Sequence, residues 1–190
     1  MKLKKIIFIG LIFLYGISNG QKTISIEEHG LNYIDKGLVD FGITHVKDVN
    51  GVLDQFVGNW EGESNGKKVK FYIDKATSIT KFAKIEIDKL IIRHQTIIDN
   101  KIIDDTTSLD ASNPLIIEGF YLSETGHYVL NYISRESDCG QSGKIYIKIG
   151  ENNNVLQCSV MLNPVFIDAE ACKDVDKHKF IPKSVLLNRM

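Results

Sequence analysis

Apolar and polar residues alternate along several short segments of this chain, the pattern of a β-strand with one buried face. The clearest examples are residues 67–74, where Val69, Phe71 and Ile73 alternate with polar residues, and residues 143–149, where isoleucines do the same. Other segments are rich in the β-branched and aromatic residues that strands prefer. Together the expected strands cover residues 60–64, 67–74, 80–87, 90–98, 115–122, 127–134, 143–149, 155–162 and 183–190.

Turn-forming residues separate these segments. Asn65-Gly66, Asp99-Asn100 and Glu124-Thr125-Gly126 are typical of tight hairpin connections between two apolar runs. About nine short strands joined in this way predict an all-β fold, either a sandwich or an up-and-down barrel. The last expected strand is strongly apolar, and pairing it with the first would remove an exposed edge. We therefore favour a single antiparallel up-and-down β-barrel of about eight to nine strands.

The beginning of the chain differs from the barrel segment. Residues 1–20 combine lysines with an apolar run too short to span a bilayer comfortably, which predicts a cleavable secretory signal peptide without a lipoprotein cysteine. Residues 21–53 show no clean period and predict an irregular N-terminal arm. The barrel domain is expected at residues 54–190, where Asp54 could cap a single helical turn. The expected location is secreted or periplasmic.

Composition narrows the classes of partner. The chain has 23 Lys and Arg against 24 Asp and Glu, and removal of the predicted leader, which is basic, makes the rest more acidic. Nucleic-acid binders usually carry a basic patch, so a nucleic-acid partner is not expected. We expect no transmembrane span after the leader, and no feature indicates a particular protein partner.

The chain has three cysteines, an odd number for an exported protein. Cys158 lies in a strand-like run, where a buried thiol behaves as a small apolar group. Cys139 and Cys172 both lie beside loop residues, so a disulfide between them is the favoured pairing, although the sequence leaves the other pairings open. A nucleophilic role for Cys139 is less favoured, because such thiols are commonly oxidised after export.

No catalytic or metal-binding motif is evident. Residues 140–143 resemble a nucleophile elbow only loosely, and the five histidines have none of the spacings of a zinc site. Asp104, Asp105 and Asp110 lie in the longest expected connection, residues 102–114, but lack the register of a calcium loop, so a solvated acidic loop is favoured. We expect no catalytic residues, no metal, no cofactor and no enzymatic activity.

A short motif resembles a known family. Gly58-Asn59-Trp60, preceded by a turn with Phe56 and followed by an expected strand, resembles the Gly-x-Trp signature that opens the first strand of lipocalins and related calycins. Arg189 stands where that superfamily often places a basic residue, packed across the tryptophan. The resemblance implies that Gly58, Trp60 and Arg189 close one end of the barrel through a cation–π contact. As a whole, the chain resembles small exported lipocalin-like bacterial proteins of uncharacterised function.

The resemblance also implies a function. The expected activity is non-catalytic binding of a small apolar or amphipathic ligand inside the barrel, entered from the end opposite Trp60. Phe71, Tyr128 and Tyr132 are candidate ligand contacts, since tyrosine has an apolar body and a polar tip, although core filling is the alternative role for them. The alternative function is an envelope protein–protein interaction module or an enzyme inhibitor acting through loops, which a filled interior would favour.

Overall fold

The computed structural model of the 190-residue chain describes residues 22–30, 42–80, 84–135, 139–150, 153–164, 170, 172–173 and 181–190. The predicted signal peptide lies outside the described residues. Strands dominate the described part, together with one helical turn at residues 26–30. The strands are β1 (Lys22–Ser25), β2 (Ile43–Lys47), β3 (Gly58–Ser64), β4 (Lys67–Ile79), β5 (Glu86–Ile98), β6 (Lys101–Asp105), β7 (Ile117–Leu122), β8 (Tyr128–Ile133), β9 (Ser142–Ile149), β10 (Val155–Leu162) and β11 (Ser184–Arg189).

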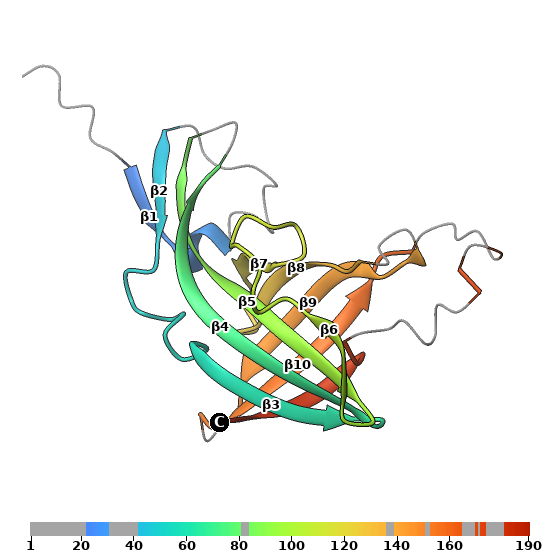
Figure 1. Ribbon diagram of the computed structural model, residues 1–190. Helices are drawn as coiled ribbons and strands as arrows, with labels where there is room; N and C mark the ends of the chain where they lie inside the picture. Colours follow the sequence, from blue (N-terminus) through green and yellow to red (C-terminus); the bar gives the residue numbers. More distant parts are fainter. Residues whose placement is uncertain are drawn as a thin grey trace, which may run out of the picture.

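Eight of these strands close into an antiparallel barrel, in the order β3, β4, β5, β7, β8, β9, β10 and β11 (Figure 1). Neighbours in space are mostly neighbours in the chain, as in an up-and-down meander. β11 returns to pair with β3, where Arg189 lies opposite Trp60. The predicted closed barrel is therefore confirmed, including the pairing of its first and last strands.

Three further strands extend the sheet at β5: β2 and β6 pair with it directly, and β1 is added through β2. Along one edge, β5 pairs in succession with β2, β7 and β6, and β1 pairs with β2 in parallel. The arm at residues 21–53, expected to be irregular with short extended pieces, contains two short strands and a helical turn in its described part. The connection predicted at 102–114 is wrong at its start, because strand β6 covers residues 101–105. All three strands bury few residues, so they lack a regular alternation of apolar positions.

The hairpin of β4 and β5 is longer than predicted. Its pairing is continuous from Lys67 opposite Ile98 to Ile79 opposite Glu86. The separate strand expected at residues 80–87 is therefore wrong, because this segment contains the connection between the two long strands. β3 pairs with β4 only as far as Ile73. The part of the β4–β5 hairpin beyond Ile73, here called the distal hairpin, therefore extends past the barrel, and β2 and β1 lie beside it (Figure 1).

The core lies inside the barrel, on the alternate residues that face inward. One cluster of buried side chains runs through it, and its largest fully buried members are Trp60, Phe56, Phe71, Tyr128, Tyr132, Leu53, Ile73, Leu90, Ile92, Ile117, Leu130 and Ile145. Packing is close enough to require glycine at position 119, where a Cβ atom would lie 2.3 Å from the Tyr128 hydroxyl. The described inward positions are thus filled by side chains.

Candidate functional site

Trp60 and Arg189 form a contact at the end of the barrel where β3 begins. The guanidinium carbon of Arg189 lies 4.2 Å from the centroid of the Trp60 ring. The two nitrogen groups of the guanidinium donate hydrogen bonds to the carbonyls of Val57 and Gln55, at 2.8 and 2.9 Å. The indole Nε1 of Trp60 donates to the Phe56 carbonyl at 2.8 Å. These contacts join the last strand to the turn before the first.

Gly58 is required by the same arrangement. Its φ of 130° is in the region that favours glycine, and a Cβ atom there would lie 2.7 Å from a terminal nitrogen of Arg189. The three residues predicted to close the barrel therefore lie together. Trp60 is fully buried, so none of its surface is accessible to a ligand in this structure.

The three aromatic residues predicted to contact a ligand are all buried in the core. Phe71 lies opposite Trp60 on the neighbouring strand, at the closed end and not at the opposite end. Tyr128 packs against Phe56 at 6.1 Å between ring centroids, and its hydroxyl accepts a hydrogen bond from the backbone nitrogen of Leu90. Of the three, only Tyr132 also borders the groove described below.

Cysteine pairing follows the favoured prediction. Cys139 and Cys172 form a disulfide, with their Cα atoms 5.6 Å apart. Cys158 is a free, buried thiol on β10, and burial raises its pKa to about 12. A thiol with such a high pKa is a poor nucleophile at neutral pH.

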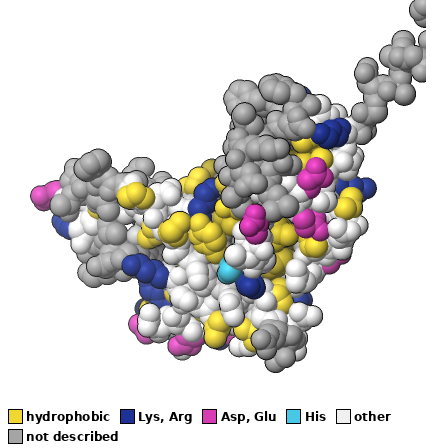
Figure 2. Space-filling model, turned by 180° about the vertical axis from the view of Figure 1, so that it is seen from behind, with side chains coloured by type: hydrophobic (Ala, Val, Ile, Leu, Met, Phe, Trp, Pro, Cys, Tyr) yellow, Lys and Arg dark blue, Asp and Glu magenta, His cyan; other side chains and the backbone are white. Residues whose placement is uncertain are grey.

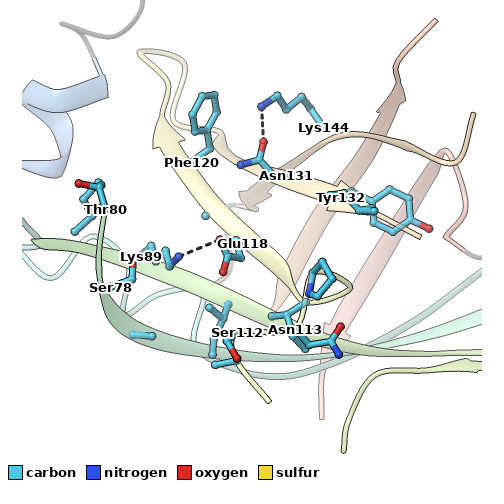
Figure 3. A pocket seen from close by; sticks show the side chains of 18 of the residues that line it. Ser78, Thr80, Lys89, Ser112, Asn113, Glu118, Phe120, Asn131, Tyr132 and Lys144 are labelled. Carbon is cyan, nitrogen blue, oxygen red and sulfur yellow. Dashed lines mark hydrogen bonds and ion pairs between the residues drawn. The ribbon is translucent and has the colours of Figure 1, made fainter. Parts of the chain in front are cut away.

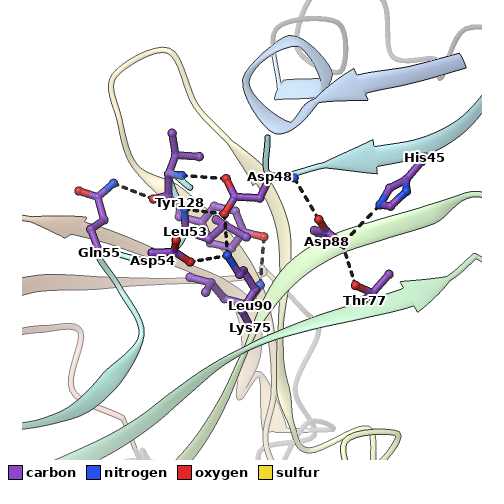
Figure 4. A network of polar contacts seen from close by, with 11 residues as sticks. His45, Asp48, Leu53, Asp54, Gln55, Lys75, Thr77, Asp88, Leu90 and Tyr128 are labelled. Carbon is purple, nitrogen blue, oxygen red and sulfur yellow. Dashed lines mark hydrogen bonds and ion pairs between the residues drawn. The ribbon is translucent and has the colours of Figure 1, made fainter. Parts of the chain in front are cut away.

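A network of polar contacts ties the arm to the barrel (Figure 4). The buried carboxylate of Asp48 accepts hydrogen bonds from the backbone nitrogens of Val52 and Leu53, so Asp48 and not Asp54 caps the turn before β3. Asp48 also forms an ion pair with Lys75, which contacts Asp54 as well. The network stabilises the turn that presents the Phe56 carbonyl to Trp60.

A second polar cluster holds β6 against β5. His94 Nε2 lies 3.0 Å from Asp104 Oδ2, and Arg135 Nε donates to the other carboxylate oxygen at 3.2 Å. Asp104, predicted to be part of a solvated loop, is therefore buried. Burial alone would raise the pKa of the Asp104 carboxyl, but the contacts with His94 and Arg135 outweigh it and hold this pKa below its usual value.

This cluster also contains a hydroxyl, because Thr106 Oγ1 lies 3.3 Å from His94 Nδ1. A hydroxyl, a histidine and a carboxylate in this order are also the parts of a nucleophilic triad. However, Thr106 Oγ1 is buried, accepts a hydrogen bond from the backbone nitrogen of His94 and donates to the backbone carbonyl of His94. With no access for a substrate, the cluster is structural.

A groove lies outside the barrel, between the distal β4–β5 hairpin and the outer face of β7, β8 and β9 (Figure 3). Its volume is about 1100 Å³. Apolar side chains gather on this side of the molecule with a few charged ones among them (Figure 2). Two isoleucines that border the groove, Ile79 and Ile133, are 61% and 43% exposed. The groove thus offers apolar surface that the fold itself leaves uncovered.

Strand register places the polar side chains of the groove in one row. Glu118 on β7 is opposite Asn131 on β8, which is opposite Lys144 on β9. Ile91 on β5 continues the row beside Glu118. Lys89, two residues before Ile91, forms an ion pair with Glu118 at 3.1 Å.

Lys144 has a different environment from Lys89. Its ammonium lies 3.8 Å from the centroid of the Phe120 ring and donates a hydrogen bond to Asn131 Oδ1. Burial lowers the pKa of Lys144. Within the described part of the chain, no carboxylate lies within 4 Å of its ammonium nitrogen.

Sequence reasoning missed this groove. Lys144 alternates with buried isoleucines, which is the pattern of any half-buried strand. The cross-strand row depends on strand register, which cannot be read from the sequence. The signal that the sequence does contain is an isoleucine at a position expected to face outward, such as Ile133, which is exposed in the structure. The described residues contain no group of three or more His, Cys, Asp and Glu side chains that could hold a metal. They also include no helix with the length and apolar character of a membrane span.

Comparison with known proteins gives no assignment: no protein-family model, no curated protein and no solved structure matches this chain.

Proposed function

We propose that this protein is an exported, lipocalin-like, non-catalytic binder of a small amphipathic molecule, and that the molecule lies in the outer groove. The observation that carries the proposal is the groove itself, with exposed Ile79 and Ile133 beside charged and hydroxyl side chains. Its volume of about 1100 Å³ is slightly above the range of about 300 to 1,000 Å³ that is usual for small-molecule sites. Apolar surface with a few convergent polar groups is the usual chemistry of such sites.

The position of the site differs from the interior expected for a lipocalin-like barrel. Phe71, Tyr128 and Tyr132 are occupied in packing the core, and opening space among them would cost the contacts they make. A filled interior favours a function at the surface, and the groove offers a surface site for a small molecule that requires no such rearrangement. The outer surface is therefore the better site for a ligand in this conformation.

The proposal of export is supported by the disulfide between Cys139 and Cys172. Disulfides persist in oxidising compartments and are rare in the cytosol. An exported carrier of an amphipathic molecule would work in that setting.

A fluorescence titration tests the site. The neutral dye N-phenyl-1-naphthylamine is titrated into the wild-type chain and into Ile79→Asn, which makes a groove residue polar. Loss of one apolar contact worth about 1.5 kcal/mol weakens binding about tenfold. The matched control is Leu186→Asn, because Leu186 on β11 is also 61% exposed and lies outside the groove.

We expect the dye to bind the wild type and the control alike and to bind Ile79→Asn more weakly. Thermal melts establish that each variant is folded. Absence of dye binding to the folded wild type would contradict the proposed function. Equal binding by all three proteins would place the ligand elsewhere and refute the groove assignment.

A further inference from the structure

We infer that the groove selects amphipathic molecules with a carboxylate headgroup, and that Lys144 and Asn131 bind this carboxylate. The inference rests on the proposed function, because it specifies the ligand of the same groove. Three observations carry it: the balance of charge along the groove, the surroundings of the Lys144 ammonium, and the hydrogen-bonding capacity of Asn131.

The charges of the described residues that border the groove do not balance. The lining includes two lysines and one glutamate. Glu118 is paired with Lys89, whose side chain is only 13% exposed. Lys144 is left as a positive charge with no carboxylate partner among the described residues. An anionic ligand would complete this charge pattern, whereas a cationic ligand would be repelled.

The ammonium of Lys144 has also lost part of its hydration. It lies against the Phe120 ring, and burial lowers its pKa. A desolvated cation that has only an amide oxygen and an aromatic face as partners gains more from an anion than a fully hydrated lysine does. The site is therefore better suited to an anion than the exposed lysines elsewhere on the strands.

Asn131 supplies a second donor beside the ammonium. Its Oδ1 accepts the hydrogen bond from Lys144, and its Nδ2 has no hydrogen-bond partner in the described part of the chain. Figure 3 shows the two side chains directed toward one another from neighbouring strands. The two donors, Lys144 Nζ and Asn131 Nδ2, match the two oxygens of one carboxylate.

The same geometry gives the apolar tail its direction. Starting from Lys144, the row continues through Asn131 and Glu118 to Ile91 on β5. The isoleucines of β5 and of the end of β4 lie beyond it and border the groove. A carboxylate at Lys144 would leave the tail over this apolar surface.

Isothermal titration calorimetry with ten-carbon ligands tests the inference. Decanoate, 1-decanol, decylamine and decyl phosphate, each below its aggregation concentration, are titrated into the wild type, Lys144→Met, Lys144→Arg and Lys148→Met. Lys148→Met is the matched control, because Lys148 lies on the same face of β9 but does not border the groove. A charge-assisted hydrogen bond corresponds to about a tenfold or larger change in affinity.

We expect the wild type to bind decanoate at least about tenfold more tightly than decanol, and decylamine most weakly. Lys144→Met should abolish this preference by weakening decanoate binding, Lys144→Arg should retain most of it, and Lys148→Met should resemble the wild type. If no ten-carbon ligand binds the folded wild type, the proposed function fails. If decanol binds as tightly as decanoate, or if both methionine variants lose the preference equally, only the headgroup inference fails. Tighter binding of decyl phosphate than of decanoate would overturn the choice of carboxylate.

Discussion

Replacement of Trp60 should lower the stability of the barrel and leave its ligand preference intact. Trp60 is fully buried, donates a hydrogen bond to the Phe56 carbonyl and lies under the guanidinium of Arg189. Trp60→Ala removes the ring and leaves a cavity, which typically costs about 3 to 5 kcal/mol. Trp60→Phe keeps part of the ring but leaves the Phe56 carbonyl without its donor, at a cost of about 1 to 3 kcal/mol.

The contact between Trp60 and Arg189 has a separate signature. In a double-mutant cycle with Trp60→Ala and Arg189→Met, the coupling free energy should be about 0.5 to 2 kcal/mol, the range of a cation–π pair. Urea unfolding followed by circular dichroism gives the free energies. Because the chain has a single tryptophan, its emission also reports on this site directly, and Arg189→Met should shift the emission to longer wavelength.

Three results would contradict parts of this reasoning. A loss of less than about 1 kcal/mol in Trp60→Ala would mean that the ring does not hold the barrel closed. Unchanged stability together with lost dye binding would show that Trp60 is a ligand contact. A coupling energy near zero would mean that Arg189 does not contribute to stability through Trp60, although the burial of Trp60 would still do so.

Three further predictions concern other features. Replacing both Cys139 and Cys172 with serine should cost about 3 to 4 kcal/mol, from a loop closed over 33 residues, measured by urea unfolding against the wild type. Thr96→Val should be neutral or stabilising, because the buried Thr96 Oγ1 has no hydrogen-bond partner among the described residues, whereas Thr106→Val should cost about 1 to 3 kcal/mol; thermal melts that reverse this order would contradict it. Because the pKa of Asp104 is lower in the folded state than its unfolded value of about 3.9, the ionised carboxyl stabilises the fold at higher pH, and this stabilisation is lost as pH falls through the folded pKa. Asp104→Asn should therefore weaken the dependence of the urea unfolding midpoint on acidic pH. An unchanged dependence would exclude this carboxyl as its source.

The barrel could be predicted from the sequence where one strand face is apolar and the other polar. Residues 67–74 and 143–149 show this alternation, and both lie within strands of the barrel. The contact that closes the barrel could also be predicted in part from the sequence, because a glycine two positions before a tryptophan is a short motif with a specific geometry. Its partner Arg189 is 129 positions away, and only the resemblance to a family connected the two.

β6 could not be predicted in the same way because its polarity is inverted. Ile102 and Ile103 are exposed, whereas Asp104 is buried. A buried carboxylate is stable there because His94 and Arg135 supply charge and hydrogen bonds. Those partners are distant in sequence, His94 on β5 and Arg135 just after β8, so the segment itself resembles a polar loop.

The candidate site was hidden for a related reason. Lys144, Asn131 and Glu118 come from three strands and meet only through their register. The groove also depends on the length of the β4–β5 hairpin beyond Ile73, which the interrupted pattern around residue 80 concealed. Sequence periodicity indicates which side of a strand is buried, but not which outward side chains of different strands become neighbours.

The pairing of β3 with β11 has a consequence for how the chain folds. The hydrogen bonds that close the barrel join Trp60 to Arg189, so every intervening barrel strand must be in place before closure. Contacts between residues so distant in sequence form slowly, because the entropy of ordering a long loop opposes them. Until closure, β3 and β11 each present an unpaired edge that can pair with another chain. We therefore expect closure to be the slow folding step, and the partly closed barrel to be the species most prone to aggregate.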